Sequence, residues 1–157
     1  MQPRRELLHA DLHYRKLENL YAEAPVTRWY GATIRIEDGA AEVRIPVREE
    51  FLHAAGAVHG SVYFRAVDDA AFFAANSRVD DALLLTSSFH LHFTRPVDEG
   101  VLVATGNVVH EGGRLLVAEA ELRDDAGRLL ARGTGTFTRS LIALSEEVGY
   151  RLPAGAA

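Results

Sequence analysis

The 157-residue sequence contains no cysteine, which excludes disulfide bonds, thiolate metal sites and a cysteine nucleophile. No apolar run approaches the roughly 20 residues that a helix needs to span a bilayer. The first residues, MQPRRELLHADLHY, are too polar for the apolar segment of a secretory signal peptide. We therefore expect a cytoplasmic protein with no membrane partner.

The sequence also has fewer basic than acidic residues. There are 17 lysines and arginines against 22 aspartates and glutamates, which gives a net charge of −5. Nonspecific nucleic-acid binding depends on a basic surface, so we expect no nucleic-acid partner. A few local arginines can still hold the phosphates of a small molecule. With 48% hydrophobic and 25% charged residues, the composition is that of one ordinary globular domain.

Two helices and a hairpin are predicted in the first half of the chain. Residues 4–24 place apolar side chains at helical spacing, and Pro25 ends this helix. Within residues 32–47, Asp38-Gly39 is typical of a tight turn between two strands. A second long helix, apolar on nearly all faces, is predicted from about Gly60 to Asn76.

The second half of the chain alternates apolar and polar residues with the period of a β-strand. Short turns separate four such segments, which predicts a meander of four antiparallel strands. A helix that is apolar on all sides must be wrapped, and this sheet is the only element that can wrap it. We therefore predict an α+β fold with a curved antiparallel sheet of about six strands around one long central helix, and an extra N-terminal helix. The four segments are residues 87–96, 101–110, 114–123 and 128–140.

Two adjacent aspartates, Asp68 and Asp69, interrupt the apolar part of the central helix. Burial of a carboxylate is costly unless a partner compensates it. Arg65 lies three and four residues earlier, at spacings that favour an ion pair with one of them. The other aspartate points about 100° away around the helix. Near a carbonyl group, a desolvated carboxylate can act as a general base or as a nucleophile.

Gly60 and Ser61 open the central helix, so their backbone N–H groups lack intrahelical acceptors. Together with the helix dipole, these groups can stabilise an oxyanion. The simpler alternative is a turn and an N-cap, with Ser61 accepting from the helix's own amides. Gly60 and Asp68 lie eight residues apart, roughly 12 Å along one helix, and cannot touch the same carbonyl carbon. If both serve one site, each must come from a different subunit, which predicts an obligate dimer.

This stretch resembles the signature of the PaaI-type hotdog-fold acyl-CoA thioesterases. Their pattern, N-x2-G-x2-H-G-G followed by D-x-A, is similar to H-x2-G-x2-H-G-S from His53 to Ser61, followed by Asp68 nine residues after His59. The F-x-R-P of residues 93–96 and the G-x-G-x-F of residues 133–137 are also similar to that family. The resemblance covers about residues 26–140. It implies an N-terminal helix in residues 1–25, a hotdog thioesterase domain in residues 26–140 and a C-terminal tail in residues 141–157.

The resemblance implies hydrolysis of an acyl-CoA thioester to a free acid and CoA, in a homodimer or a dimer of dimers, without a metal or cofactor. By this resemblance the Gly60 amide binds the thioester oxygen. Asp68 of the opposite subunit activates water or attacks the carbonyl. His59 holds the loop or the thioester, and Thr86 orients water.

Two positions depart from the family pattern: His53 replaces an asparagine and Ser61 replaces a glycine. His53 can still hydrogen-bond water or substrate, and Ser61 keeps its backbone N–H. Asp69 is a second carboxylate that could contact substrate. Arg95 could meet the phosphates of CoA, as could Arg132 and Arg139, although for any one of the three we expect a solvated arginine on a strand face.

Other uses of the same residues stay open. A hydratase or dehydratase on this fold would use His59 or His53 as its acid or base. A non-catalytic acyl-CoA binder or sensor would need no competent carboxylate. Two histidine pairs, His90 with His92 and His9 with His13, have a spacing that suits a metal, but neither has a third ligand nearby, so we expect no metal.

Overall fold

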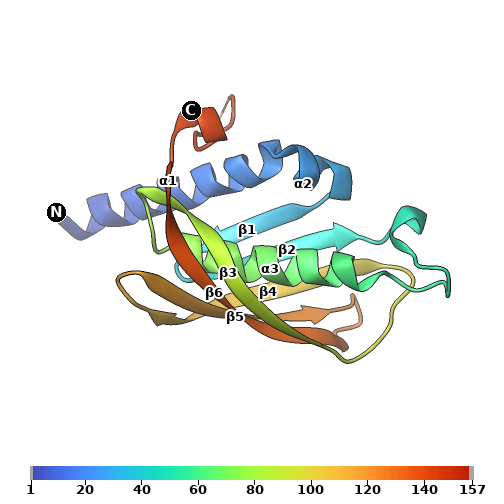
Figure 1. The fold of residues 1–157 in the computed structure, drawn as a ribbon. Helices are drawn as coiled ribbons and strands as arrows, with labels where there is room; N and C mark the ends of the chain where they lie inside the picture. Colours follow the sequence, from blue (N-terminus) through green and yellow to red (C-terminus); the bar gives the residue numbers. More distant parts are fainter. Residues whose placement is uncertain (1, 156–157) are drawn as a thin grey trace.

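The computed structural model describes residues 2–155, and Figure 1 shows its path. Two helices precede a hairpin, a long helix follows, and four strands complete the chain. None of the helices within residues 2–155 is both long and apolar enough to cross a membrane. The elements are α1 (Gln2–Glu23), α2 (Pro25–Tyr30), β1 (Thr33–Glu37), β2 (Ala40–Pro46), η1 (Glu49–Phe51), α3 (Gly60–Asn76), β3 (Ala82–Phe93), β4 (Val101–Glu111), β5 (Leu115–Arg123), β6 (Leu129–Ala143) and η2 (Glu146–Val148).

All six strands form one antiparallel sheet in the order β1-β2-β4-β5-β6-β3, curved around α3. This architecture is the hotdog fold, as predicted. Alternate residues of β2, β4 and β5 are buried, which is the pattern of a sheet with one face on the core. The strands β1 and β3 form the two edges of the sheet.

The prediction of a four-strand meander is wrong for its first strand. β3 pairs with β6 and not with β4, so only β4, β5 and β6 form a meander. Residues 94–100 carry the chain past the start of α3, where the Val58 N–H donates to the Val97 carbonyl at 2.8 Å. Alternation of apolar residues specifies which face of a strand is buried, but it does not specify the neighbouring strand.

The small residues of α3 allow the sheet to approach the helix closely. Ala66, Ala70, Ala71, Ala74 and Ala75 are all buried. A side chain at Gly106 of β4 would place its Cβ 2.2 Å from the carbonyl oxygen of Ala70, so only glycine fits there. This close approach fixes the rotation of α3, and therefore decides which of its residues remain uncovered.

α1 covers the region of β1, and the chain end returns over it (Figure 1). α1 ends before Pro25 as predicted, but Pro25 also begins the short helix α2, which was not predicted. Residues 141–157 were expected to form a C-terminal tail, of which residues 156–157 lie outside the described part of the chain. Instead β6 continues to Ala143, and Tyr150 lies half-buried with its O–H 2.7 Å from His13 Nδ1. Gly149, Tyr150 and Arg151 all form hydrogen bonds to α1.

Candidate functional site

The first turn of α3 is capped by a histidine. His59 Nδ1 accepts from the Ser61 backbone N–H at 3.1 Å and lies 2.7 Å from Ser61 Oγ. Because the amide can only donate, Nδ1 must be unprotonated, so the Ser61 hydroxyl donates to it and the neutral ring carries its proton on Nε2. The expected N-cap is present, but the acceptor is the His59 ring and not Ser61.

The backbone N–H of Gly60 donates to no residue in the part of the chain that the structure describes. The ring of Phe93 lies against this glycine, since a Cβ built at Gly60 would be 3.1 Å from a ring carbon. The amide is therefore a donor at the positive end of a 17-residue helix, next to an aromatic wall. Phe93 belongs to the F-x-R-P motif, but no pattern in the sequence predicted its contact with Gly60.

Asp68 lies two turns further along α3 and faces β3. Its carboxylate is half-buried, and burial raises its pKa above the ordinary aspartate value. The Thr86 hydroxyl donates to Asp68 Oδ1 at 2.9 Å and opposes that rise, because it stabilises the charged form. Thr86 and Asp68, both predicted site residues, are thus in contact. Oδ2 has no hydrogen-bond partner within the described residues.

Asp69 has a different environment, although it is the next residue. It is buried, with Arg65 Nε 2.6 Å from its Oδ2 and the Tyr21 hydroxyl donating to the same oxygen at 2.7 Å. Burial raises the pKa of Asp69 to about 6, while Arg65 and Tyr21 oppose the rise. Arg65 also donates to Thr27. The predicted pairing of Arg65 with one aspartate is confirmed, and the pair joins α3 to α1 through Asp69 and to α2 through Arg65.

His53 lies on the exposed loop that precedes α3. Its ring Nδ1 accepts from the backbone N–H of Ala55 at 3.1 Å, and the backbone N–H of His53 donates to the carbonyl of Ala57 at 2.8 Å. The His59 N–H donates to the carbonyl of Phe51, which closes the base of the loop. Both loop histidines therefore hold a backbone amide with one ring nitrogen, and both side chains are exposed.

The three arginines considered for phosphate binding differ in their partners. Arg132 pairs with Glu119 and Glu121, and Arg139 pairs with Asp81. Arg95 is exposed and forms no ion pair with any residue that the structure describes. It lies two residues after Phe93, near the start of α3, where the Tyr63 hydroxyl donates to its carbonyl. Of the three, Arg95 is the one whose guanidinium has no carboxylate partner among the described residues, so it can bind an external anion.

An uncovered stripe runs along α3 and carries the predicted site residues. Its members recur at helical spacing: Gly60, Ser61, Phe64, Arg65, Asp68 and Phe72 are all exposed or half-buried, whereas the remaining residues of the helix, from Val62 to Asn76, are buried. Next to the start of the stripe, β3 exposes Phe93, which is 58% exposed. Phe64 is 41% exposed and packs edge-on against Phe89. Exposed aromatic rings therefore lie beside Gly60 and between Gly60 and Asp68 along the helix.

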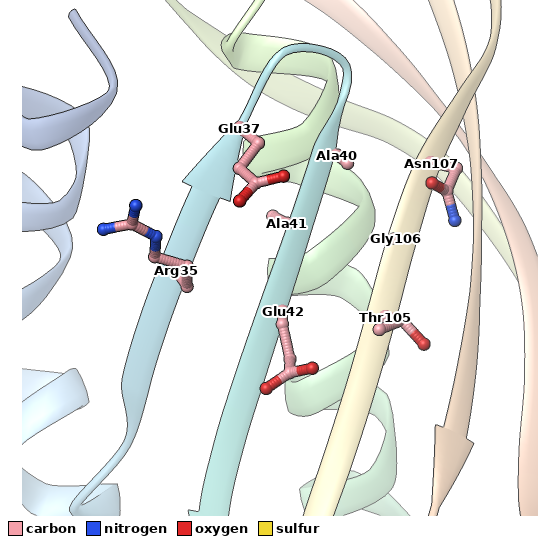
Figure 2. Close-up of a pocket in the computed structure, with 8 residues that line it drawn as sticks. All are labelled: Arg35, Glu37, Ala40, Ala41, Glu42, Thr105, Gly106 and Asn107. Carbon is pink, nitrogen blue, oxygen red and sulfur yellow. The ribbon is translucent and has the colours of Figure 1, made fainter. Parts of the chain in front are cut away.

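Figure 2 shows a hollow on a different part of the sheet. Arg35, Glu42 and Thr105 lie directly across β1, β2 and β4 from one another and face away from α3. Glu37 and Asn107 complete its polar rim. It contains none of the predicted site residues, and we assign no chemistry to it.

Histidine and carboxylate side chains do not gather into a set of three or more metal ligands among the residues whose side chains the structure describes, 9–155. The pair of His9 and His13 is not a chelate, because His13 is buried and both of its ring nitrogens are engaged, with Tyr150 and with the carbonyl of Asn76. His90 and His92 do approach each other, on the outer face of β3.

Comparisons with known proteins agree with the hotdog fold and identify the family. The sequence model described as the thioesterase superfamily matches residues 55–131. A protein of Saccharolobus solfataricus, named as a candidate esterase, is 33% identical over 105 residues, which are 66% of this chain and 74% of that protein. The E. coli PaaI protein, from the phenylacetic acid degradation operon, has a similar fold with a TM-score of 0.76, 24% identity, and coverage of 85% of this chain and 99% of that chain. A thioesterase of Haemophilus influenzae aligns with a TM-score of 0.70 and 17% identity over 76% of this chain and 85% of its own.

Proposed function

Because this chain belongs to the thioesterase superfamily, we propose that it hydrolyses acyl-CoA thioesters to a free acid and CoA. The observation that carries the proposal is the uncovered stripe of α3. It holds, at Gly60, a backbone donor with no acceptor among the described residues and, at Asp68, a half-buried carboxylate. An oxyanion donor and a base are the two groups that hydrolysis of a thioester requires.

In the proposed reaction Asp68 takes a proton from water as the water oxygen bonds to the thioester carbon. The carbonyl oxygen becomes an oxyanion and accepts a hydrogen bond from the Gly60 N–H. Collapse of this intermediate breaks the carbon–sulfur bond, and CoA leaves as a thiolate. A thiol pKa near 8.5, roughly that of free cysteine, makes it a good leaving group. The Thr86 hydroxyl holds the Asp68 carboxylate in place through Oδ1, which leaves Oδ2 for water.

Two copies of the chain are needed to bring these groups together. Gly60 and Asp68 are each four residues from Phe64. An antiparallel pairing of two α3 helices about Phe64 therefore sets Gly60 of one subunit opposite Asp68 of the other. The exposed apolar side chains on the stripe and on β3 favour such a contact, and β3 is an unpaired edge of the sheet. Arg95, near the start of α3, is placed to meet a phosphate of CoA.

The test is release of CoA from a panel of acyl-CoAs, detected with a thiol reagent. The protein has no cysteine and adds no signal of its own. We expect hydrolysis by the native protein and a loss of about 10²- to 10⁴-fold in Asp68→Asn, the range for removal of a general base. Asp80→Asn, which changes an exposed aspartate beyond the end of α3, is the matched control and should keep native activity.

A native protein that binds acyl-CoA but hydrolyses no member of the panel would contradict the proposal and favour a sensor. Full activity in Asp68→Asn would overturn the assigned base. Both results are interpretable only if the variant keeps the native melting temperature and oligomeric state, which circular dichroism and light scattering measure.

A further inference from the structure

His90 and His92 lie on β3, two residues apart, and both are exposed. Their Nε2 atoms are 3.1 Å apart. The residues that alternate with them, Phe89 and Leu91, are half-buried and pack against the core. The two imidazoles therefore stand on the outer face of the sheet, opposite the face that carries α3.

The distance between the two nitrogens suits a hydrogen bond and is also short enough for both to bind one metal ion. With Zn–N bonds of about 2.0–2.1 Å, two imidazoles on one zinc ion lie about 3.3 Å apart at a tetrahedral angle and about 2.9 Å apart at a right angle. The observed 3.1 Å falls between these values. We propose that His90 and His92 chelate a divalent transition-metal ion such as zinc through their Nε2 atoms.

The rest of the chain offers no comparable pair among the residues that the structure describes. Of the seven histidines, His13 has both ring nitrogens occupied, and His53 and His59 each hold a backbone amide. There is no cysteine to compete for a soft ion. His90 and His92 alone present two ring nitrogens to one point.

The surroundings of the pair allow a cation to bind. Arg132 is directly across from His92, but Glu119 and Glu121 pair with its guanidinium and compensate its charge. Thr134 is across from His90 and carries no charge. In the absence of metal, the Nε2–H of one ring donates to the Nε2 of the other. To bind a metal through Nε2, both rings must carry their protons on Nδ1. A neutral imidazole can shift its proton between the two nitrogens, so neither ring loses a proton when the metal binds. The remaining coordination positions face water.

The experiment is isothermal titration of the full chain, without an affinity tag, with zinc chloride. We expect one zinc ion per chain, and affinity at least about tenfold weaker in His90→Gln and in His92→Gln, because a single imidazole loses the chelate effect. The control His110→Gln changes an exposed histidine that lies apart from the pair on β4 and should bind zinc as the native chain does.

Absence of zinc binding to the native chain would overturn the proposal, and so would native affinity in either β3 variant. Far-UV circular dichroism establishes that each variant is folded. Release of CoA in metal-free buffer should be the same for His90→Gln and the native chain, so failure of the metal site and failure of the proposed hydrolysis are separate results.

Discussion

Gly60 combines two properties in the first turn of α3. Its N–H has no acceptor within the described chain, and its Cα lies against the ring of Phe93. Its φ is negative or extended, unlike that of the seven glycines with left-handed backbone, so glycine is not needed there for backbone freedom. The absence of a side chain instead keeps the amide open between His59 and Phe93.

Two substitutions at this position separate the amide from the space around it. Proline is well tolerated at the first residue of a helix, so Gly60→Pro removes the backbone N–H while α3 stays intact. Gly60→Ala adds a Cβ at the same place as proline does, so that Phe93 must move by a few tenths of an ångström in either variant. The alanine variant, however, keeps the backbone N–H. We expect kcat for thioester hydrolysis to fall about 10²- to 10³-fold in the proline variant and far less in the alanine variant.

The measurement is kcat and KM for both variants with the best substrate of the panel. Equal losses in the two variants would show that the space beside Phe93, and not the amide, matters for the reaction.

At the scale of elements, the hairpin turn and the two long helices, which depend on residues close together in the sequence, were predicted correctly. The Asp38-Gly39 turn has its glycine at a φ of +67°, and α3 runs from Gly60 to Asn76 as expected. The partner of β3 could not be predicted, because pairing with β6 depends on the curvature of the whole sheet. The contact between Asp68 and Thr86 likewise joins a helix to a strand 18 residues away. The motif predicted the members of the candidate site, whereas its geometry required the fold.

The chain end provided a second difference from expectation, and one of the polar contacts that hold it to α1 is made by a buried histidine. His13 of α1 lies 2.7 Å from the Tyr150 hydroxyl and 3.2 Å from the carbonyl of Asn76, at the end of α3. Its bond to a carbonyl requires Nε2–H, so Nδ1 accepts from Tyr150 in the neutral ring. Three segments of the chain are thus joined by one neutral imidazole.

This junction makes the stability of the fold depend on pH. Burial lowers the pKa of His13 below its ordinary value of 6.5. Below pH 6.5 the unfolded chain takes up a proton that the folded protein resists, so the free energy of unfolding should fall as the pH drops from about 6.5 towards the lowered pKa. Urea unfolding at several pH values should show a smaller decline for His13→Gln than for the native chain. His110→Gln should keep the native decline; an unchanged slope in His13→Gln would contradict this account.

At the scale of the molecule, the proposed site is divided between subunits, and mixing experiments can detect this. A heterodimer of Asp68→Asn and Gly60→Pro chains has one site with both groups intact if the groups come from different chains, and none if they come from the same chain. Random assortment of equal amounts makes half of the dimers mixed, so about a quarter of the native activity per chain should return. The measurement is release of CoA after the two inactive variants are unfolded and refolded together.

Each variant refolded alone is the control and should stay inactive. If the mixture is also inactive although mixed dimers form, the division of the site between subunits is wrong.

The pairing of β3 with β6 also has a consequence for synthesis of the chain. β3 ends at Phe93, whereas the strand that pairs with it spans residues 129 to 143. A ribosome adds about 5–20 residues per second, so β3 waits several seconds before its partner emerges. During that interval Phe89 and Leu91 have no sheet to pack into, and the strand is open to other nascent chains on the same message. The order of strands in the finished sheet thus leaves β3 without its neighbour until the end of synthesis, because β6, the last strand to be translated, is the one that pairs with it.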